Sequence, residues 1–458
     1  MLSVSFDDGA NFKQYVLYCK EKFVGDIIIK LLGLMSNLKN KLTLLLVILM
    51  LSFLTGSSCS TYKVTVGDKT MYGMNYDTWF SQPRIWFETN GYGAVFTGAN
   101  YQGGNDLTPQ SGMNEYGLSF GTLATPTPNM VKSFVNKKPI QSRSKYLKDI
   151  LHSCKNVEEV KAFIEEYDHS TFSNDVFIYT DKSGKYLIVE PYELIPGSDN
   201  KYVLANFCPS TITDFGSIKQ QRYVDGVAFL KDKIDTSLAF CTALSDTMHV
   251  CRKKIGDGTL LTSILDLNNG IVHLYFYHDY KHMVQFNLKD ELSKGNHSYE
   301  IASLFPANIE YQKLLDFQTP LNNDTIDWFL RLCLTLFVFS FFYFLISYVK
   351  NRKTELANYK LLLASLSLCL AYYMFALATV MAIFYFPSPY KSYKFGLIDI
   401  ASYLPYLLIL LIIPLLIINR KVFKVNTWKT TSKYLFTANN IAYLILISLF
   451  CYWGFYNI

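Results

Sequence analysis

The chain divides into stretches of very different hydropathy. A short apolar run covers residues 42–54, and residues 59–322 then mix polar and apolar positions as a soluble domain does. Four longer apolar segments follow, at residues 328–349, 361–386, 400–418 and 434–455. A helix of such a length can cross about 30 Å of hydrocarbon. The pattern predicts one soluble domain followed by four transmembrane helices.

Within residues 59–322 the periodicity changes from that of strands to that of helices and back. Apolar and polar residues alternate on both sides of Gly184 and of Gly270, as they do in β-hairpins. Residues 143–154 and 157–167 instead show the spacing of amphipathic helices. Strands, then helices, then strands are typical of an α+β domain built from layers.

The first apolar run has the features of a secretory signal peptide. Two lysines precede it, a small polar stretch follows it, and it is too short to span a bilayer comfortably. Cleavage after Ser58 would make Cys59 the first residue of the mature chain. A start at Met35 would give a signal of ordinary length, residues 35–58, and would make residues 1–34 a non-native extension.

The loops between the four long apolar segments differ in charge. The loops after the first and third segments are rich in lysine and arginine, whereas the loop after the second has only Lys391 and Lys394. Because basic loops stay on the cytoplasmic side, residues 59–322 are expected on the extracytoplasmic side, as the signal peptide also requires. The segments themselves contain almost no charge, which argues against a transporter.

Composition excludes some classes of partner. The net charge of +6 is small for 458 residues, so a nucleic-acid partner is not indicated. His273, His278 and His282 are close in sequence, but their spacing along a strand does not bring them to one face. We therefore expect no metal and no cofactor.

Cysteines outside the apolar segments and beyond the signal peptide are odd in number, so at least one thiol is free or pairs elsewhere. They are Cys59, Cys154, Cys208, Cys241 and Cys251. Cys241 and Cys251 could form a disulfide, which the sequence leaves open.

A cysteine at a chain start combines a nucleophile with a base. The free α-amino group has a pKa of about 7.7 to 8.0, so it can take the thiol proton without help from a histidine. The alternative for Cys59 is a lipoprotein, in which the sulfur carries a lipid. Lipoprotein signals expect leucine at the third position before the cysteine, where this chain has Gly56.

Three short motifs occur in order from Cys59 onward. They are Cys-Ser-Thr-Tyr at residues 59–62, Gly-Met-Asn-Tyr-Asp at 73–77 and Ser-Gly-Met-Asn-Glu-Tyr-Gly-Leu at 111–118. Together with the strand at 202–206 and Arg222, they resemble the choloylglycine hydrolase family of linear amide C–N hydrolases. This family includes bile salt hydrolases and penicillin V acylases and is related to acid-ceramidase-like amidases. The likeness covers roughly residues 59 to 290.

The resemblance implies a four-layer αββα fold of the N-terminal-nucleophile hydrolases and four site residues. Cys59 would be the nucleophile through its thiol and the base through its amine, and Asp77 would hold their geometry. Asn206 would donate to the oxyanion of the tetrahedral intermediate, and Arg222 would favour the thiolate. The implied substrate is a linear N-acyl amide, cleaved through a thioester on Cys59.

Two positions depart from the family pattern. Met74 stands where the family has an arginine beside the nucleophile, and Ala124 stands where bile salt hydrolases place an asparagine. Bile salts and penicillin V are therefore poorly supported as substrates. The membrane helices favour amphipathic substrates, such as N-acyl lipids or acylated amino acids, and contact with membrane lipid. The alternative function is a membrane-anchored binding or sensor protein without catalysis.

Overall fold

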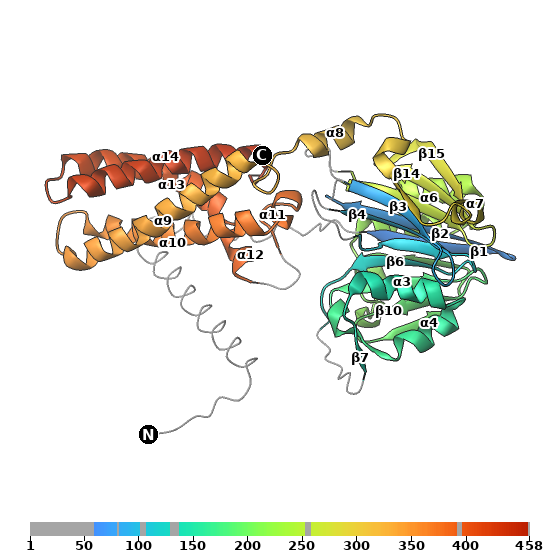
Figure 1. Cartoon of the computed structure of the whole chain (residues 1–458). Coiled ribbons are helices and arrows are strands. Elements are labelled where there is room, and N and C mark those ends of the chain that lie inside the picture. The colour runs from blue at the N-terminus through green and yellow to red at the C-terminus, as the bar shows by residue number, and fades with distance from the viewer. Residues whose placement is uncertain are drawn as a thin grey trace, which may run out of the picture. The chain divides into compact units, whose positions relative to one another are not determined.

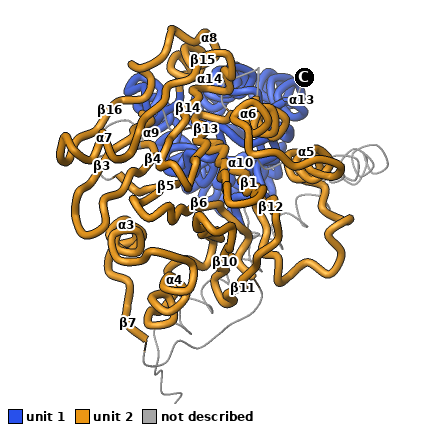
Figure 2. The backbone as a smooth tube through the Cα atoms, turned by 90° about the vertical axis from the view of Figure 1, so that its right-hand side faces the viewer, with its two compact units in different colours: residues 1–55, 319–458 blue, residues 56–318 orange. Residues whose placement is uncertain are grey.

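The computed structural model describes residues 59–79, 82–100, 107–128, 137–251, 258–391 and 396–456. The chain forms two compact units, one within residues 56–318 and one that contains residues 319–458 (Figure 2). The predicted signal peptide, Met35 and the bond before Cys59 lie outside the described residues.

Six antiparallel strands form the first sheet of the larger unit, in the order β12-β1-β2-β13-β14-β15. They are β12 (Lys201–Leu204), β1 (Ser60–Val66), β2 (Lys69–Thr78), β13 (Gly258–Asp266), β14 (Ile271–Phe276) and β15 (Asp279–Asn287). The hairpin predicted around Gly270 joins β13 to β14. Gly270 has a φ of +63°, a left-handed conformation that glycine adopts without a steric penalty.

Eight strands form the second sheet, in the order β11-β10-β9-β6-β5-β4-β3-β16. They are β11 (Leu194–Gly197), β10 (Tyr186–Val189), β9 (Asp175–Thr180), β6 (Ser119–Ala124), β5 (Ser111–Asn114), β4 (Ala94–Asn100), β3 (Gln82–Glu88) and β16 (His297–Glu300). The predicted hairpin at Gly184 joins β9 to β10. Two short strands, β7 (Lys138–Pro139) and β8 (Tyr167–Asp168), pair separately.

Helices cover the outer face of each sheet (Figure 1). Apolar side chains of α3 (Arg143–Ser153) and α4 (Val157–Ile164) pack on the eight-stranded sheet. Side chains of α5 (Gln221–Phe229) and α6 (Leu238–Met248) pack on the six-stranded sheet. The layers therefore follow one another as helix, sheet, sheet and helix, and the predicted four-layer αββα arrangement is confirmed.

Polar groups as well as apolar ones join the two sheets. The ammonium group of Lys63 on β1 is fully buried, and it donates to the carbonyl of Gly184 at 2.7 Å and to the Thr65 hydroxyl at 3.0 Å. Burial lowers the pKa of Lys63 to about 8, although Asp199 and Asp181 oppose this shift. Because a buried charge is costly unless it is hydrogen-bonded, these contacts fix how β1 faces the second sheet.

The remaining described helices of the larger unit are short. They are η2 (His169–Phe172), η3 (Pro209–Thr211), η4 (Phe215–Ser217), α7 (Leu288–Leu292), η5 (Ile301–Leu304) and α8 (Ile309–Asp316). Cys241, which the sequence offered as a disulfide partner of Cys251, is a free buried thiol of α6.

Four helical segments of the second unit are long and apolar enough to cross a membrane, as predicted. They are α9 (Asp324–Lys350), α10 (Ala357–Thr379), α12 (Leu397–Ala401) with α13 (Leu404–Lys424), and α14 (Thr430–Tyr452). Ser340 of α9 donates to Asn439 of α14 at 3.1 Å, and Asn419 of α13 donates to Thr437 of α14 at 3.0 Å. Such hydrogen bonds between helices hold a bundle together in lipid.

The second apolar segment, predicted to run over residues 361–386, is interrupted. Helix α10 ends at Thr379, Val380 is extended, and α11 (Ala382–Tyr385) follows as a separate turn. The Thr379 hydroxyl donates to the carbonyl of Phe375 at 2.9 Å. Two successive β-branched residues with a side chain bonded back to the helix favour an end at this point.

The close contact between β1 and β2 generates a stability prediction. A methyl group in Gly73→Ala would lie 2.1 Å from the ring of Tyr62. Tyr62 cannot swing away, because its hydroxyl donates to the Cys241 carbonyl at 2.6 Å and lies 2.9 Å from the Ser245 hydroxyl. We expect a loss of about 1–3 kcal/mol in unfolding free energy, measured by denaturant unfolding of the purified chain.

Gly216→Ala is the matched control. Its methyl group would meet only the Asp214 carboxylate, at 3.1 Å, on an exposed turn. Its stability should stay within about 0.5 kcal/mol of the wild type. Equal stability of the two variants would contradict the steric account.

Candidate active site

The register of the first sheet places three of the four predicted site residues around the start of β1. Ser60 pairs with Asn75 of β2, and Thr61 pairs with Leu204 of β12. Cys59, directly before β1, therefore lies beside the end of β2, which carries Asp77. It also lies near the loop that leaves β12, which carries Asn206.

The Cys59 side chain is only 6% exposed, and its sulfur lies 3.9 Å from the backbone carbonyl oxygen of Asp77. Burial, and secondly the negative charge of Asp77, raise the pKa of the Cys59 thiol to about 12. The hydrogen bond to the Asp77 backbone and the charge of Arg222 oppose this rise. The thiol is therefore protonated at neutral pH, and forming its thiolate would require a base.

Asp77 is held by the neighbouring strand β13. The Thr259 hydroxyl donates to Asp77 Oδ1 at 2.6 Å and accepts from the backbone N–H of Val250 at 2.9 Å. The β2–β13 register shifts between Thr259 and Leu261, as it does at a β-bulge. Because a bulge re-aims one side chain, it accounts for Thr259 lying against the carboxylate.

Asn206 lies at the centre of a three-residue turn, in which the Phe207 N–H donates to the Ala205 carbonyl at 2.9 Å. Its side-chain amide has a defined orientation. Asn206 Nδ2 donates to the Ala124 carbonyl at 2.5 Å, and Asn206 Oδ1 accepts from the guanidinium of Arg222.

Arg222 comes from the first turn of α5 and is 8% exposed. Its Nη2 donates to Asn206 Oδ1 and also to Gln220 Oε1, the latter at 3.2 Å. Its charge lowers the pKa of the Cys59 thiol. The predicted residues thus form two pairs in contact, Cys59 with Asp77 and Asn206 with Arg222, and the charge of Arg222 acts on the Cys59 thiol.

The two departures from the family pattern also lie in this region. Met74 is buried on β2, and a Cβ atom added at Gly121 of β6 would lie 3.0 Å from its sulfur. Met74 therefore points between the sheets and brings no charge to Cys59. Ala124 has no side-chain donor, and its backbone carbonyl instead accepts the Asn206 amide.

Two residues that hold the candidate site side chains were not predicted from the sequence. Thr259 holds Asp77, and Gln220 holds Asn206. Thr259 is one of two threonines in β13, and only the bulge distinguishes it from Thr262. Gln220 precedes a second glutamine, Gln221, and nothing in the sequence shows which of the two faces Asn206.

The three histidines considered as metal ligands lie in different surroundings. His273 is buried on β14, whereas His282 is exposed and contacts Asp279 at 2.8 Å. Burial, and secondly the charge of His249, lower the pKa of His278 to about 4. Within the described part of the chain, no group of three or more His, Cys, Asp or Glu residues is arranged to hold a metal ion.

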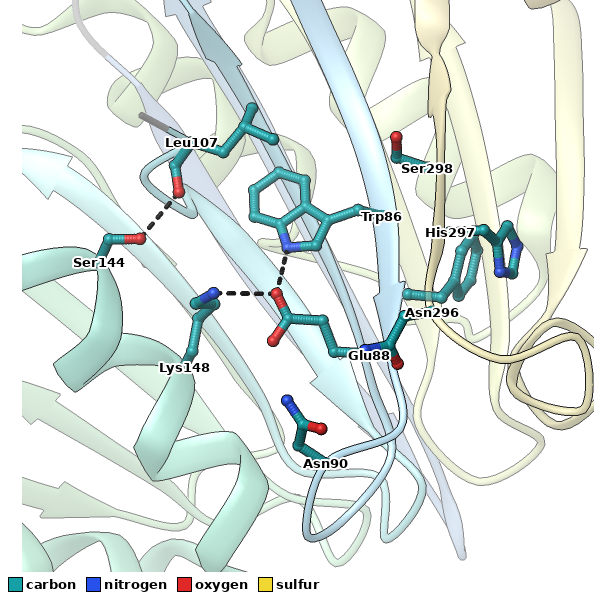
Figure 3. A pocket seen from close by; sticks show the side chains of 10 residues that line it. Trp86, Glu88, Asn90, Leu107, Ser144, Lys148, Asn296, His297 and Ser298 are labelled. Carbon is teal, nitrogen blue, oxygen red and sulfur yellow. Dashed lines mark hydrogen bonds and ion pairs between the residues drawn. The ribbon is translucent and has the colours of Figure 1, made fainter. Parts of the chain in front are cut away.

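A hollow of about 590 Å³ lies elsewhere, between β3, β16 and α3 (Figure 3). Glu88 in this hollow accepts from Trp86 Nε1 and from Lys148 Nζ, both at 3.0 Å. Although burial opposes it, hydrogen bonds from His152 and Lys148 lower the pKa of Glu88 to about 2. None of the four predicted site residues lines this hollow, so it provides no catalytic group for them.

Solved structures similar to this chain include three with TM-scores of 0.41 to 0.42. A mutant of conjugated bile acid hydrolase from Clostridium perfringens has a TM-score of 0.42 and 16% identity, over 55% of this chain and 97% of that one. A second variant of that enzyme has a TM-score of 0.41 and 17% identity over the same shares. Penicillin V acylase from Agrobacterium tumefaciens has a TM-score of 0.41 and 15% identity, over 53% of this chain and 91% of that one.

The chain matches no family model, and no curated protein is similar to it in sequence. At these identities the structural similarities assign no role to any residue of this chain.

The opposing charges near Cys59 give a prediction about thiol reactivity. Asp77→Asn removes a charge that raises the pKa of the thiol, so Cys59 should react with iodoacetamide at lower pH. Arg222→Gln removes a charge that lowers this pKa, so the reaction should need higher pH. Alkylation rates over a pH series, with the Cys59 peptide quantified by mass spectrometry, measure both shifts.

Cys154 serves as an internal control. Burial, and secondly the charge of Glu159, raise the pKa of its thiol to about 12, and neither Asp77 nor Arg222 contributes. Its alkylation profile should be the same in both variants. A shift of Cys59 in the same direction in both variants would contradict the assigned electrostatics.

Proposed function

We propose that this chain is an amide hydrolase that cleaves the C–N bond of a linear N-acyl substrate, with Cys59 as an N-terminal nucleophile. The observation that carries the proposal is the placement of Cys59 against Asp77 and of Asn206 against Arg222. Each of these side chains is at most 9% exposed, and each is held by a neighbouring element. The order of the motifs after Cys59 supports the same reaction class.

Removal of the segment before Cys59 creates the base that the thiol lacks. The new α-amino group takes the thiol proton, and the sulfur attacks the substrate carbonyl. Asn206 Nδ2, which has a second hydrogen besides the one given to Ala124, donates to the oxyanion. The amine product then leaves with a proton from the α-ammonium group, and water hydrolyses the thioester to release the acid.

Asp77 and Arg222 act on the electrostatics of this step. Arg222 offsets the negative charge that develops on sulfur and oxyanion, and it holds Asn206 through its Oδ1 atom. Asp77, fixed by Thr259, stabilises the α-ammonium group that forms when the thiol gives up its proton.

The proposed substrate is amphipathic, with an apolar acyl chain, and the proposed site of action is the extracytoplasmic membrane surface. Four helices long and apolar enough to cross a membrane follow the domain. The basic loops of the sequence and the signal peptide support an exported domain.

The second candidate is a binding or sensor protein without catalysis. Met74 favours it, because the nucleophile then has one cation fewer beside it. A lipidated Cys59 is less compatible with the geometry, because its sulfur is buried at the start of β1 and packs against Asp77.

The state of the N-terminus separates these candidates. We expect the purified full chain to begin at Cys59 with a free amine and a free thiol, because the reaction needs both groups. N-terminal sequencing and intact mass measure this directly. A diacylglyceryl group on Cys59 would reject the proposed hydrolase.

We propose acyl p-nitroanilides with acyl chains of about two to sixteen carbons as probes of activity. The purified wild-type chain should hydrolyse them, and Cys59→Ala should abolish this hydrolysis. Cys241→Ala removes a buried thiol of the helix layer on the six-stranded sheet and is the matched control, so its activity should persist if the variant folds. Unchanged turnover in Cys59→Ala would reject the mechanism.

Asn206→Ala tests the oxyanion donor. Losing one such donor typically lowers kcat by about 10²–10³, and we expect that loss with KM changed much less. Steady-state kinetics on the same anilides measure both parameters. A variant that raises only KM would show that Asn206 binds the substrate without stabilising the oxyanion.

A further inference from the structure

The turn that carries Asn206 is stabilised by a side chain from outside it. Asn206 follows strand β12, and the chain then passes through η3 and η4 before α5 begins at Gln221. The residue at the junction is Gln220. Its backbone carbonyl accepts from the N–H groups of Tyr223 at 2.9 Å and Val224 at 3.1 Å, so Gln220 is tied to the first turn of α5.

The carboxamide of Gln220 pairs with the backbone of Asn206 in both directions. Gln220 Oε1 accepts from the Asn206 N–H at 3.1 Å, and Gln220 Nε2 donates to the Asn206 carbonyl at 3.0 Å. The same Oε1 accepts from Arg222 Nη2 at 3.2 Å. One side chain thus contacts both the proposed oxyanion donor and the cation that orients it.

These bonds account for the polar groups of Asn206. Gln220 takes its N–H and carbonyl, Arg222 takes Oδ1, and Ala124 takes one hydrogen of Nδ2. A second Nδ2 hydrogen is left over. Without Gln220, both backbone groups of Asn206 would lose these partners, and a partly buried group left unpaired costs stability.

The chemistry of the contact requires a primary amide of this length. Glutamate offers an acceptor for the Asn206 N–H but no donor for its carbonyl, and it adds a negative charge beside Arg222. Asparagine is shorter by one methylene group. Glutamine at the base of a fixed helix supplies a donor and an acceptor together.

We infer that Gln220 is a positioning residue of the proposed active site, which holds Asn206 and Arg222 so that the free Asn206 Nδ2 hydrogen reaches the oxyanion. The inference rests on the proposed amide hydrolysis. Gln220 itself does not touch the substrate.

The experiment compares Gln220→Ala with Gln221→Ala in the full chain. Gln221 is the matched control, because it is the adjacent glutamine, is exposed, and donates to Asp225 at 2.8 Å on the outer face of α5. On the p-nitroanilides, Gln220→Ala should lower kcat by about 10- to 100-fold with KM nearly unchanged. This loss is smaller than the one expected for Asn206→Ala, because the oxyanion donor is still present but less well held. Gln221→Ala should have wild-type kcat.

A double-mutant cycle separates positioning from a general loss of structure. In an Asn206→Ala background, Gln220→Ala should lower kcat by less than about twofold more, because its effect passes through Asn206. Fully additive losses, or equal kcat in Gln220→Ala and Gln221→Ala, would overturn the inference.

Thiol reactivity distinguishes failure of this inference from failure of the proposed function. Gln220→Ala should shift the pH profile of Cys59 alkylation upward, as Arg222→Gln does, because the guanidinium loses one of the groups that hold it. If the wild-type chain hydrolyses none of the anilides, the proposed function fails, and this profile still decides the role of Gln220. An unshifted profile would then overturn it.

Discussion

Strand β1 is hydrogen-bonded on both sides, to β2 and to β12, and this double pairing determines where Cys59, Asp77 and Asn206 lie. Cys59 is the residue before β1, so its position is set once Ser60 and Thr61 are paired. The partner strand β2 then ends in Asp77, and the partner strand β12 leads into Asn206. Lys63 of β1 donates a hydrogen bond to the carbonyl of Gly184, in the β9–β10 hairpin of the second sheet, and this contact fixes β1 against that sheet. A shift of one residue in either pairing would separate these groups, because it would turn each side chain to the opposite face.

Burial of the candidate site explains why its charged groups have fixed partners and why the pKa of its thiol is raised. Charged groups removed from water need partners, and Asp77 and Arg222 each have one from an adjacent element. The same burial raises the pKa of the Cys59 thiol to about 12. The proposed mechanism supplies the base that such a thiol would need, namely the α-amino group of a new chain start. Networks of this kind depend on every member, since each unpaired buried group is costly.

The sequence predicted those features that depend on periodicity and on motifs. Alternation around Gly184 and Gly270 predicted two hairpins, and the spacing of residues 143–154 predicted a helix of the outer layer. Hydropathy predicted four membrane helices but not the interruption after Thr379. Hydropathy depends only on residue type and carries no information on the hydrogen bond from the Thr379 hydroxyl to its own helix. The roles of Thr259 and Gln220 depend on a bulge and on a three-residue turn, and neither has a pattern in the sequence. At Ala124 the relevant group is a backbone carbonyl, which no residue identity reveals.

The pleat of β1 has a consequence for maturation. Only one residue, Cys59, separates the proposed cut from the first paired residue, so the mature chain would have no spare length at its start. Successive side chains of a strand point to opposite faces, and Ser60 therefore lies on the face of Tyr62, toward the helix layer. Cleavage one bond later would make Ser60 the first residue, and its hydroxyl lies on the face opposite to that of the Cys59 thiol. Cleavage one bond earlier would place the free α-amino group on Ser58, one residue away from the thiol. In the proposed mechanism, the alternation of side chains along β1 would therefore make the bond before Cys59 the one productive site of cleavage.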